Sequence, residues 1–306
     1  MMSKQKSAPN YPKRPLGAMV WVGFAVSAGF LFFFLRDIKA RDLGESLRSI
    51  SPTWLLLSAL VLLSEFWIRA LRWKLLLQPI RESPVKALLE ATLIGAAGNT
   101  LLPMRAGDVA RAMVAAGSTG IRLTTVLATN VMERVYDLFG LVSILALTFL
   151  LLPEQLAAQP DDQERIQNLA LYGKIIGLCA VSGMAVFFFL ANKPRKALGL
   201  VSFFTRPLPR PLRNKIQDLS GAFIEGLSAT QSAKHILLAV VLSLVLWFNL
   251  SLAIFLLFKA FHLPLPYAAA CFITVAIALA VVVPQAPGYL GVFQSVIEVT
   301  LGIWTA

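Results

Sequence analysis

The chain has 306 residues, of which 57% are hydrophobic and 14% are charged, so it is far more apolar than an ordinary soluble domain. Its net charge is +12, and it has two cysteines and two histidines, all four separated along the chain. This usage excludes a disulfide framework and argues against a zinc or iron site. The apolar residues form runs near the roughly 20 residues that cross a hydrocarbon core, which predicts a membrane protein.

A basic tail precedes the first apolar run, 16–35. The run is too long for the apolar region of a secretory signal, and no small-residue cleavage site precedes Arg36, so we predict a retained transmembrane helix. We therefore divide the chain into a cytoplasmic tail, 1–15, and a single transmembrane domain, 16–306. Segment 36–53 mixes charges of both signs and is interpreted as an interfacial helix.

The remaining apolar residues fall into two kinds of segment. Clear spans are predicted at 54–68, 123–152, 169–190 and 236–258. Two further stretches, 87–102 and 267–283, each end in a break rich in proline and glycine. These two breaks are unusual for membrane-spanning helices.

The charges between the runs indicate the topology. Segments 69–86 and 191–235 are basic, whereas 153–168 is acidic, so the positive-inside rule places the first two in the cytoplasm and the third outside. Segment 87–122 must then leave the membrane on the side where it entered, as a re-entrant hairpin or as two short spans. The basic segment 191–235 is also suited to anionic membrane lipids.

The two broken segments start from opposite sides of the membrane in this topology. An inverted repeat produces that arrangement, and Pro103 and Gly107 have the same spacing as Pro284 and Gly288. Little else aligns, so internal symmetry stays an open alternative. The predicted fold class is an all-α, polytopic transmembrane helical bundle with two broken or re-entrant helical hairpins.

Ionisable side chains within apolar helices usually pair or face a watery cavity, because a charge at mid-membrane costs about 3 kcal/mol on insertion scales. Glu65, Arg69 and Arg72 share one helical face, and we interpret Glu65 and Arg69 as a structural ion pair. On the run 123–152, charged residues at spacings of three and four form one stripe, which exceeds what a structural pair requires. The stripe is interpreted as a functional lining and consists of Asn130, Glu133, Arg134 and Asp137.

The break after 87–102 reads "NTLLPMRAGDVAR" (99–111). Gly107 is predicted to start a helix, with Asp108 near its N-terminus as a cap and Arg111 one turn later. Arg105 precedes that helix, close to amide groups that the break leaves unpaired, which favours a phosphate site. The alternative is a cytoplasmic loop whose charges reach toward the interface.

The second break supplies prolines and glycines that free the backbone from helical bonding. They are Pro284, Pro287, Gly288 and Gly291. Glu298 follows in an apolar helix with no basic residue after it, so it needs a partner from elsewhere or must be protonated.

Four pieces of sequence, in this order, resemble the family of the lysylphosphatidylglycerol synthase transmembrane domain, also called flippase-like integral membrane proteins. They are "RALRWKLLL" (69–77), "GNTLLPMRAGDVAR" (98–111), "ERVYDLFGL" (133–141) and "PQAPGYLGVFQSVIE" (284–298). The resemblance implies a multi-pass protein of the bacterial inner membrane that handles phospholipids or polyprenyl-linked lipids. No soluble synthase domain is expected beside this region, which leaves the substrate open.

The resemblance and the charge pattern together select the candidate substrate-binding residues. These are Arg72, Asn99, Pro103, Arg105, Gly107, Asp108, Arg111, Glu133, Arg134, Asp137, Pro284, Pro287, Gly288, Gly291 and Glu298. The arginines would attract an anionic headgroup, and the carboxylates would hold the arginines in place when the site is empty.

The favoured hypothesis is a transporter of a lipid or lipid-linked substrate. One alternative is a membrane enzyme that transfers a lipid-linked sugar or phosphate, with Glu133 and Asp137 in metal binding or acid–base chemistry. Another is a non-transporting partner of a lipid synthase. For the transporter we expect no catalytic residue, metal or cofactor, no nucleotide-binding loop and no nucleic-acid partner, and a homo-oligomer stays open.

Overall fold

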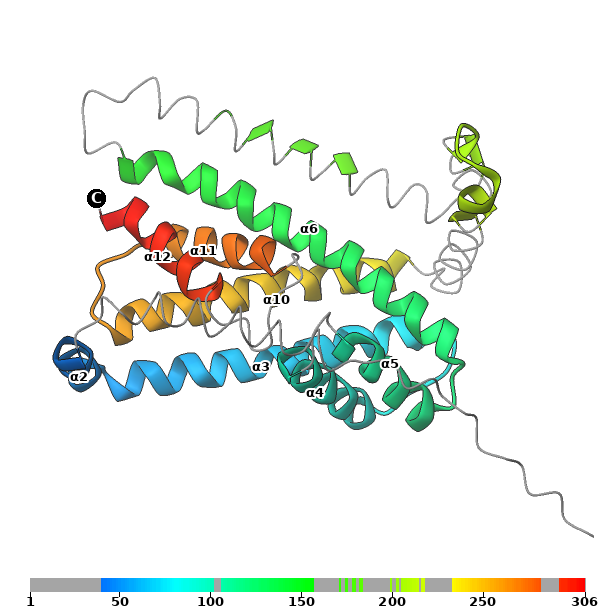
Figure 1. The fold of residues 1–306 in the computed structure, drawn as a ribbon, viewed down its shortest axis with the longest axis horizontal. Helices are drawn as coiled ribbons and strands as arrows, with labels where there is room; N and C mark the ends of the chain where they lie inside the picture. Colours follow the sequence, from blue (N-terminus) through cyan, green and yellow to red (C-terminus); the bar gives the residue numbers. More distant parts are fainter. Residues whose placement is uncertain are drawn as a thin grey trace, which may run out of the picture.

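The structure is a computed structural model that describes residues 40–101, 106–156, 233–281 and 292–305, with short pieces between 171 and 217. Regular structure in these parts is entirely helical, without a strand, which confirms the all-α class (Figure 1). The helices are α2 (Ala40–Ser49), α3 (Pro52–Leu77), α4 (Val85–Leu101), α5 (Ala106–Thr119), α6 (Leu123–Leu156), α10 (Ala233–Ala260), α11 (Tyr267–Ala280) and α12 (Val292–Thr305).

The predicted runs agree with these helices except at one end. The expected span 54–68 continues as α3 to Leu77, because Arg69 and Arg72, which seemed to close the span, pair with Glu65 and Asp137. Residues 16–35, most of 169–190, and the breaks at 102–105 and 282–291 lie outside the described residues.

Helices α3 and α10 lie side by side along most of their lengths (Figure 1). Both are long and apolar enough to cross a membrane. Polar side chains connect them within this apolar interface: Ser58 Oγ donates to the carbonyl of Ala253 at 2.8 Å, and Asn249 Nδ2 donates to the carbonyl of Val61 at 2.8 Å. These bonds set the register of the pair, since an unpaired polar group would be costly there.

Helix α6 packs across α10 and α11. Its 34 residues give a length of about 51 Å, more than the roughly 30 Å of a hydrocarbon core. Gly140 allows the contact with α10, because a Cβ at this position would collide with the indole of Trp247. The first half of α6 extends beyond this contact and packs against α5.

Helices α4 and α5 pack against each other as a hairpin beside the second half of α3 and the first half of α6 (Figure 1). A Cβ on Gly98 would lie 2.8 Å from the Cα of Gly107, so the two backbones approach closely where both residues are glycine. The helices have 17 and 14 residues, or about 26 and 21 Å. Each is therefore shorter than a hydrocarbon core.

Candidate substrate-binding site

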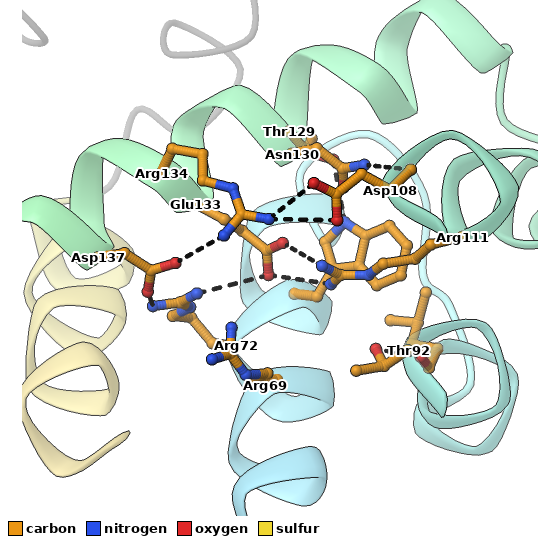
Figure 2. Close-up of polar contacts among 12 residues, drawn as sticks. Arg69, Arg72, Thr92, Asp108, Arg111, Thr129, Asn130, Glu133, Arg134 and Asp137 are labelled. Atoms are coloured by element: carbon orange, nitrogen blue, oxygen red, sulfur yellow. Dashed lines mark hydrogen bonds and ion pairs between the residues drawn. The ribbon is translucent and has the colours of Figure 1, made fainter. Parts of the chain in front are cut away.

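Six charged side chains meet where α3, α5 and α6 come together, and Figure 2 shows them as one connected group. We call this group the charged network; it consists of Arg72, Asp108, Arg111, Glu133, Arg134 and Asp137. All six were candidates from the sequence. The structure supplies their pairing.

Helix α6 provides half of the network. Glu133 and Asp137 are one turn apart and both are buried, whereas Arg134 is exposed beside them. The helical spacing of three and four residues therefore aims the two carboxylates between α3 and α5. This places the predicted stripe against protein on one side and leaves one edge of it accessible.

Arg72 of α3 is fully buried, with 0% of its surface exposed. Its Nη1 donates to Asp137 Oδ1 at 2.6 Å and to Ser243 Oγ of α10 at 2.7 Å, while its Nη2 lies 3.8 Å from Glu133 Oε1. Its Nε and Nη2 make no hydrogen bond among the described residues. A buried guanidinium with unused N–H groups is able to donate to a further anionic oxygen.

Arg111 of α5 is held at its end by Glu133 and on one face by Trp73. Its two terminal nitrogens bind the Glu133 carboxylate at 2.8 and 3.2 Å, and its guanidinium carbon lies 3.8 Å from the ring centre of Trp73. The indole is itself fixed, because its Nε1 donates to Thr129 Oγ1 at 3.0 Å. Such bidentate, stacked geometry suits arginine and would not suit lysine.

Gly95 of α4 makes room for the Arg111 stem. A Cβ at Gly95 would lie 2.7 Å from the Arg111 Cβ, closer than side-chain carbons pack. Arg111 therefore occupies a slot between Gly95 and Trp73. Neither of these residues was a sequence candidate, although Trp73 follows Arg72 directly within one of the quoted motifs.

The remaining pair joins Asp108 of α5 to Arg134 of α6. Arg134 Nη2 donates to the two carboxylate oxygens at 3.1 and 3.3 Å, and its Nη1 lies 3.6 Å from Asp137 Oδ2. The side chains are 47% and 33% exposed. Asp108 lies in the first turn of α5, and its carboxylate also accepts a hydrogen bond from Asn99 of α4 at 3.0 Å.

The charges alternate in sign through the network. From Arg111 the contacts run to Glu133, Arg72, Asp137, Arg134 and Asp108. Three arginines and three carboxylates balance, and both ends of the series lie on α5. The hairpin is thus joined to α6 by two ion pairs, one buried and one accessible.

Other sequence candidates lie apart from this network. Glu65 and Arg69 form their own ion pair at 2.5 Å within α3, as predicted, so Arg72 takes partners on other helices. Glu298 is exposed on α12 and makes none of the network contacts. Gly107 is buried at the hairpin contact.

Six candidates lie outside the described residues. They are Pro103, Arg105, Pro284, Pro287, Gly288 and Gly291. Across the part of the chain that the structure describes, no three or more His, Cys, Asp or Glu side chains gather as a metal site.

Long apolar helices around a buried, charge-balanced network define a helical integral membrane protein. A family model described as "Lysylphosphatidylglycerol synthase TM region" matches residues 20–304 of the chain. The chain belongs to this family, which makes it a membrane protein linked to lipid metabolism and confirms the resemblance seen in the motifs. No curated protein and no solved structure matches it.

Proposed function

We propose that this protein is a multi-pass transporter that moves a lipid or lipid-linked substrate across the bacterial inner membrane, with an anionic headgroup bound at the charged network. The observation that carries the proposal is Arg72, a guanidinium with 0% exposure whose Nε and Nη2 donors are unused among the described residues. Buried charges in membrane helices are costly, and they typically mark substrate or ion pathways.

The chemistry of the network supports an anionic headgroup. A guanidinium presents a planar fork that matches two oxygens of a phosphate as well as it matches a carboxylate. A phosphate that replaces one carboxylate therefore exchanges one ion pair for another. The balanced charges keep the arginines paired and oriented when no substrate is bound, which limits the cost of an empty site.

The shape of the hairpin supports a substrate path at this end of the bundle. Helices α4 and α5 are each shorter than the hydrocarbon core, and α3 ends where α6 begins. A hairpin that enters and leaves on the cytoplasmic side would bring the network to membrane depth while keeping Arg134 accessible.

Reconstitution into liposomes tests this proposal. Purified protein would be placed in vesicles that contain a fluorescent phosphatidylglycerol, and headgroup movement between leaflets would be followed by quenching from outside. We expect movement with the unaltered protein, and loss of it in Arg72→Gln and Arg134→Gln. Arg122→Gln, an exposed residue just before α6, is the matched control and should transport normally.

The outcomes separate the alternatives. Movement no faster than in protein-free vesicles, for every lipid-linked probe offered, would contradict a transporter. Product formed from a lipid-linked donor without movement would favour the membrane enzyme. Because the Arg134 side chain is about half exposed, Arg134→Gln is expected to fold, so its loss of transport would not be a loss of structure.

A further inference from the structure

The two ion pairs that join α5 to α6 differ in how easily they can be exchanged. Arg111 and Glu133 are buried, with side chains 8% and 4% exposed, whereas Arg134 and Asp108 are 47% and 33% exposed. A partner that arrives from water or from a headgroup layer reaches the second pair first. The hairpin therefore has one fixed ion pair and one accessible ion pair with α6, and Asn130 Nδ2 of α6 also donates to the backbone carbonyl of Asp108 at 3.4 Å.

We propose that a phosphate oxyanion enters the network at Arg134 and displaces the Asp108 carboxylate, which removes the accessible ion pair between the α4–α5 hairpin and α6. Arg111 and Glu133 stay joined and act as the pivot. This inference rests on the proposed function and names the residue through which the substrate first engages the site, a role distinct from that of the buried Arg72.

Arg134 is built for such an exchange. Its Nη2 binds both oxygens of Asp108, while its Nη1 lies 3.6 Å from Asp137. When Asp108 leaves, Asp137 still holds the guanidinium at the edge of the network through Nη1, and the Nη2 group that faced Asp108 is open to a phosphate oxygen. An exposed ion pair contributes little to stability, so its replacement requires little free energy.

Arg111 is unsuited to the same role. It is bidentate on Glu133, stacked on Trp73 and confined by Gly95. Displacing it would leave the Glu133 carboxylate buried, with Arg72 at 3.8 Å as its remaining ion-pair partner among the described residues. Breaking a buried pair is far more costly than exchanging an exposed one. The pivot therefore holds while the accessible pair opens.

Substitutions of the two members of this ion pair should therefore change the affinity for phosphate in opposite directions. Asp108 competes with the phosphate for Arg134, so Asp108→Asn should bind a phosphate about two- to fivefold more tightly, given the strength of exposed pairs. The Asn99 hydrogen bond is kept, since an asparagine oxygen can still accept it. Arg134→Gln removes the ligand contact and should weaken binding by about tenfold or more. If the ion pair were purely structural, both substitutions would change the affinity for phosphate in the same direction.

The experiment uses the full chain in nanodiscs, with an environment-sensitive fluorophore on Met113→Cys. Met113 is 59% exposed on α5, and Cys179, which is also exposed, is replaced by alanine. One arm raises the mole fraction of phosphatidylglycerol in phosphatidylcholine. The other adds inorganic phosphate to discs of phosphatidylcholine alone. Glu90→Gln and Arg122→Gln, both exposed, are the matched controls for loss of a carboxylate and of an arginine.

We expect the lipid fraction or phosphate concentration that gives half of the maximal fluorescence change to be lower for Asp108→Asn and higher for Arg134→Gln. Both controls should match the unaltered protein. A response in the lipid arm assigns the ligand to the headgroup, and a response in the phosphate arm alone assigns it to free phosphate; either supports the proposal. No response in either arm, or shifts of the same sign in the two variants, overturns it. Opposite shifts without lipid movement in vesicles would leave this inference standing and contradict transport.

Discussion

The guanidinium carbon of Arg111 lies 3.8 Å from the ring centre of Trp73, although the two residues belong to α5 and α3. The indole is fully buried and is fixed to α6 through Thr129. One aromatic side chain therefore connects three helices and orients the buried arginine toward Glu133. The geometry of the buried Arg111–Glu133 ion pair therefore depends on Trp73, a residue that carries no charge.

Replacing Trp73 should separate packing from orientation. Trp73→Leu removes the ring face and leaves a cavity, so the free energy of unfolding should fall by about 2–4 kcal/mol. Trp73→Phe keeps a ring under Arg111 and loses the hydrogen bond to Thr129, which should cost about 1–2 kcal/mol. Denaturant unfolding in detergent micelles would measure both. Equal losses in the two variants would contradict the role of the ring.

The glycines of the hairpin should respond to alanine in opposite ways. Gly95→Ala places a Cβ 2.7 Å from the Arg111 Cβ and forces the stem to shift, so we expect a loss of about 1–3 kcal/mol. Gly117→Ala lies in open space on α5 and should stabilise that helix by about 0.5–1 kcal/mol. Melting temperatures of the two variants test this, and a Gly95→Ala protein as stable as the parent would count against the slot.

Loss of the Glu133 carboxylate should lower the free energy of unfolding more than loss of any other carboxylate in the charged network. It is buried between Arg111 and Arg72, so Glu133→Gln leaves two buried cations with less compensation, at a cost of about 3–5 kcal/mol. Glu90→Gln, on the exposed face of α4, should change stability by about 0.5 kcal/mol or less. The combined variant Glu133→Gln, Arg111→Met should cost less than the sum of the single changes. Additive costs would show that the pair is not coupled.

The re-entrant topology predicts the labelling of two positions. Lys86→Cys at the start of α4 and Arg122→Cys just before α6 are both exposed sites. In a Cys179→Ala background, a membrane-impermeant maleimide should label both from the cytoplasmic side of intact vesicles or cells. Labelling from opposite sides would mean that the segment between them crosses the membrane.

Much of the helical framework could be predicted from hydropathy and spacing. The apolar runs gave α4, α6, α10 and α11 within a few residues, and the spacing of Glu133, Arg134 and Asp137 put them on one stripe. The predicted end of α3 was wrong, because a hydropathy run stops at the first cluster of charged residues. Arg72 continues the helix since its charge is met by Asp137 and Ser243, partners 65 and 171 residues away in the chain.

The pairing within the site could not be predicted in the same way. Periodicity places residues on the face of one helix, but it does not say which neighbouring helix meets that face. Trp73, Gly95 and Ser243 gave no signal, since a tryptophan, a glycine and a serine are ordinary in apolar helices. Each acts through an arginine that was already a candidate, so the missing information was tertiary contact.

Helix α5 carries one aspartate and one arginine, Asp108 and Arg111, and no other charged residue. Displacing one elementary charge through the full membrane field involves about 2.3 kcal/mol per 100 mV. If α5 shifts as a unit, the two contributions cancel. In a swing about Arg111 only the Asp108 charge is displaced, and that displacement is short because Asp108 lies one turn from the pivot. The membrane potential therefore does little electrical work on a swing of this helix, and a strong voltage dependence would come from the charge of the cargo or from other segments.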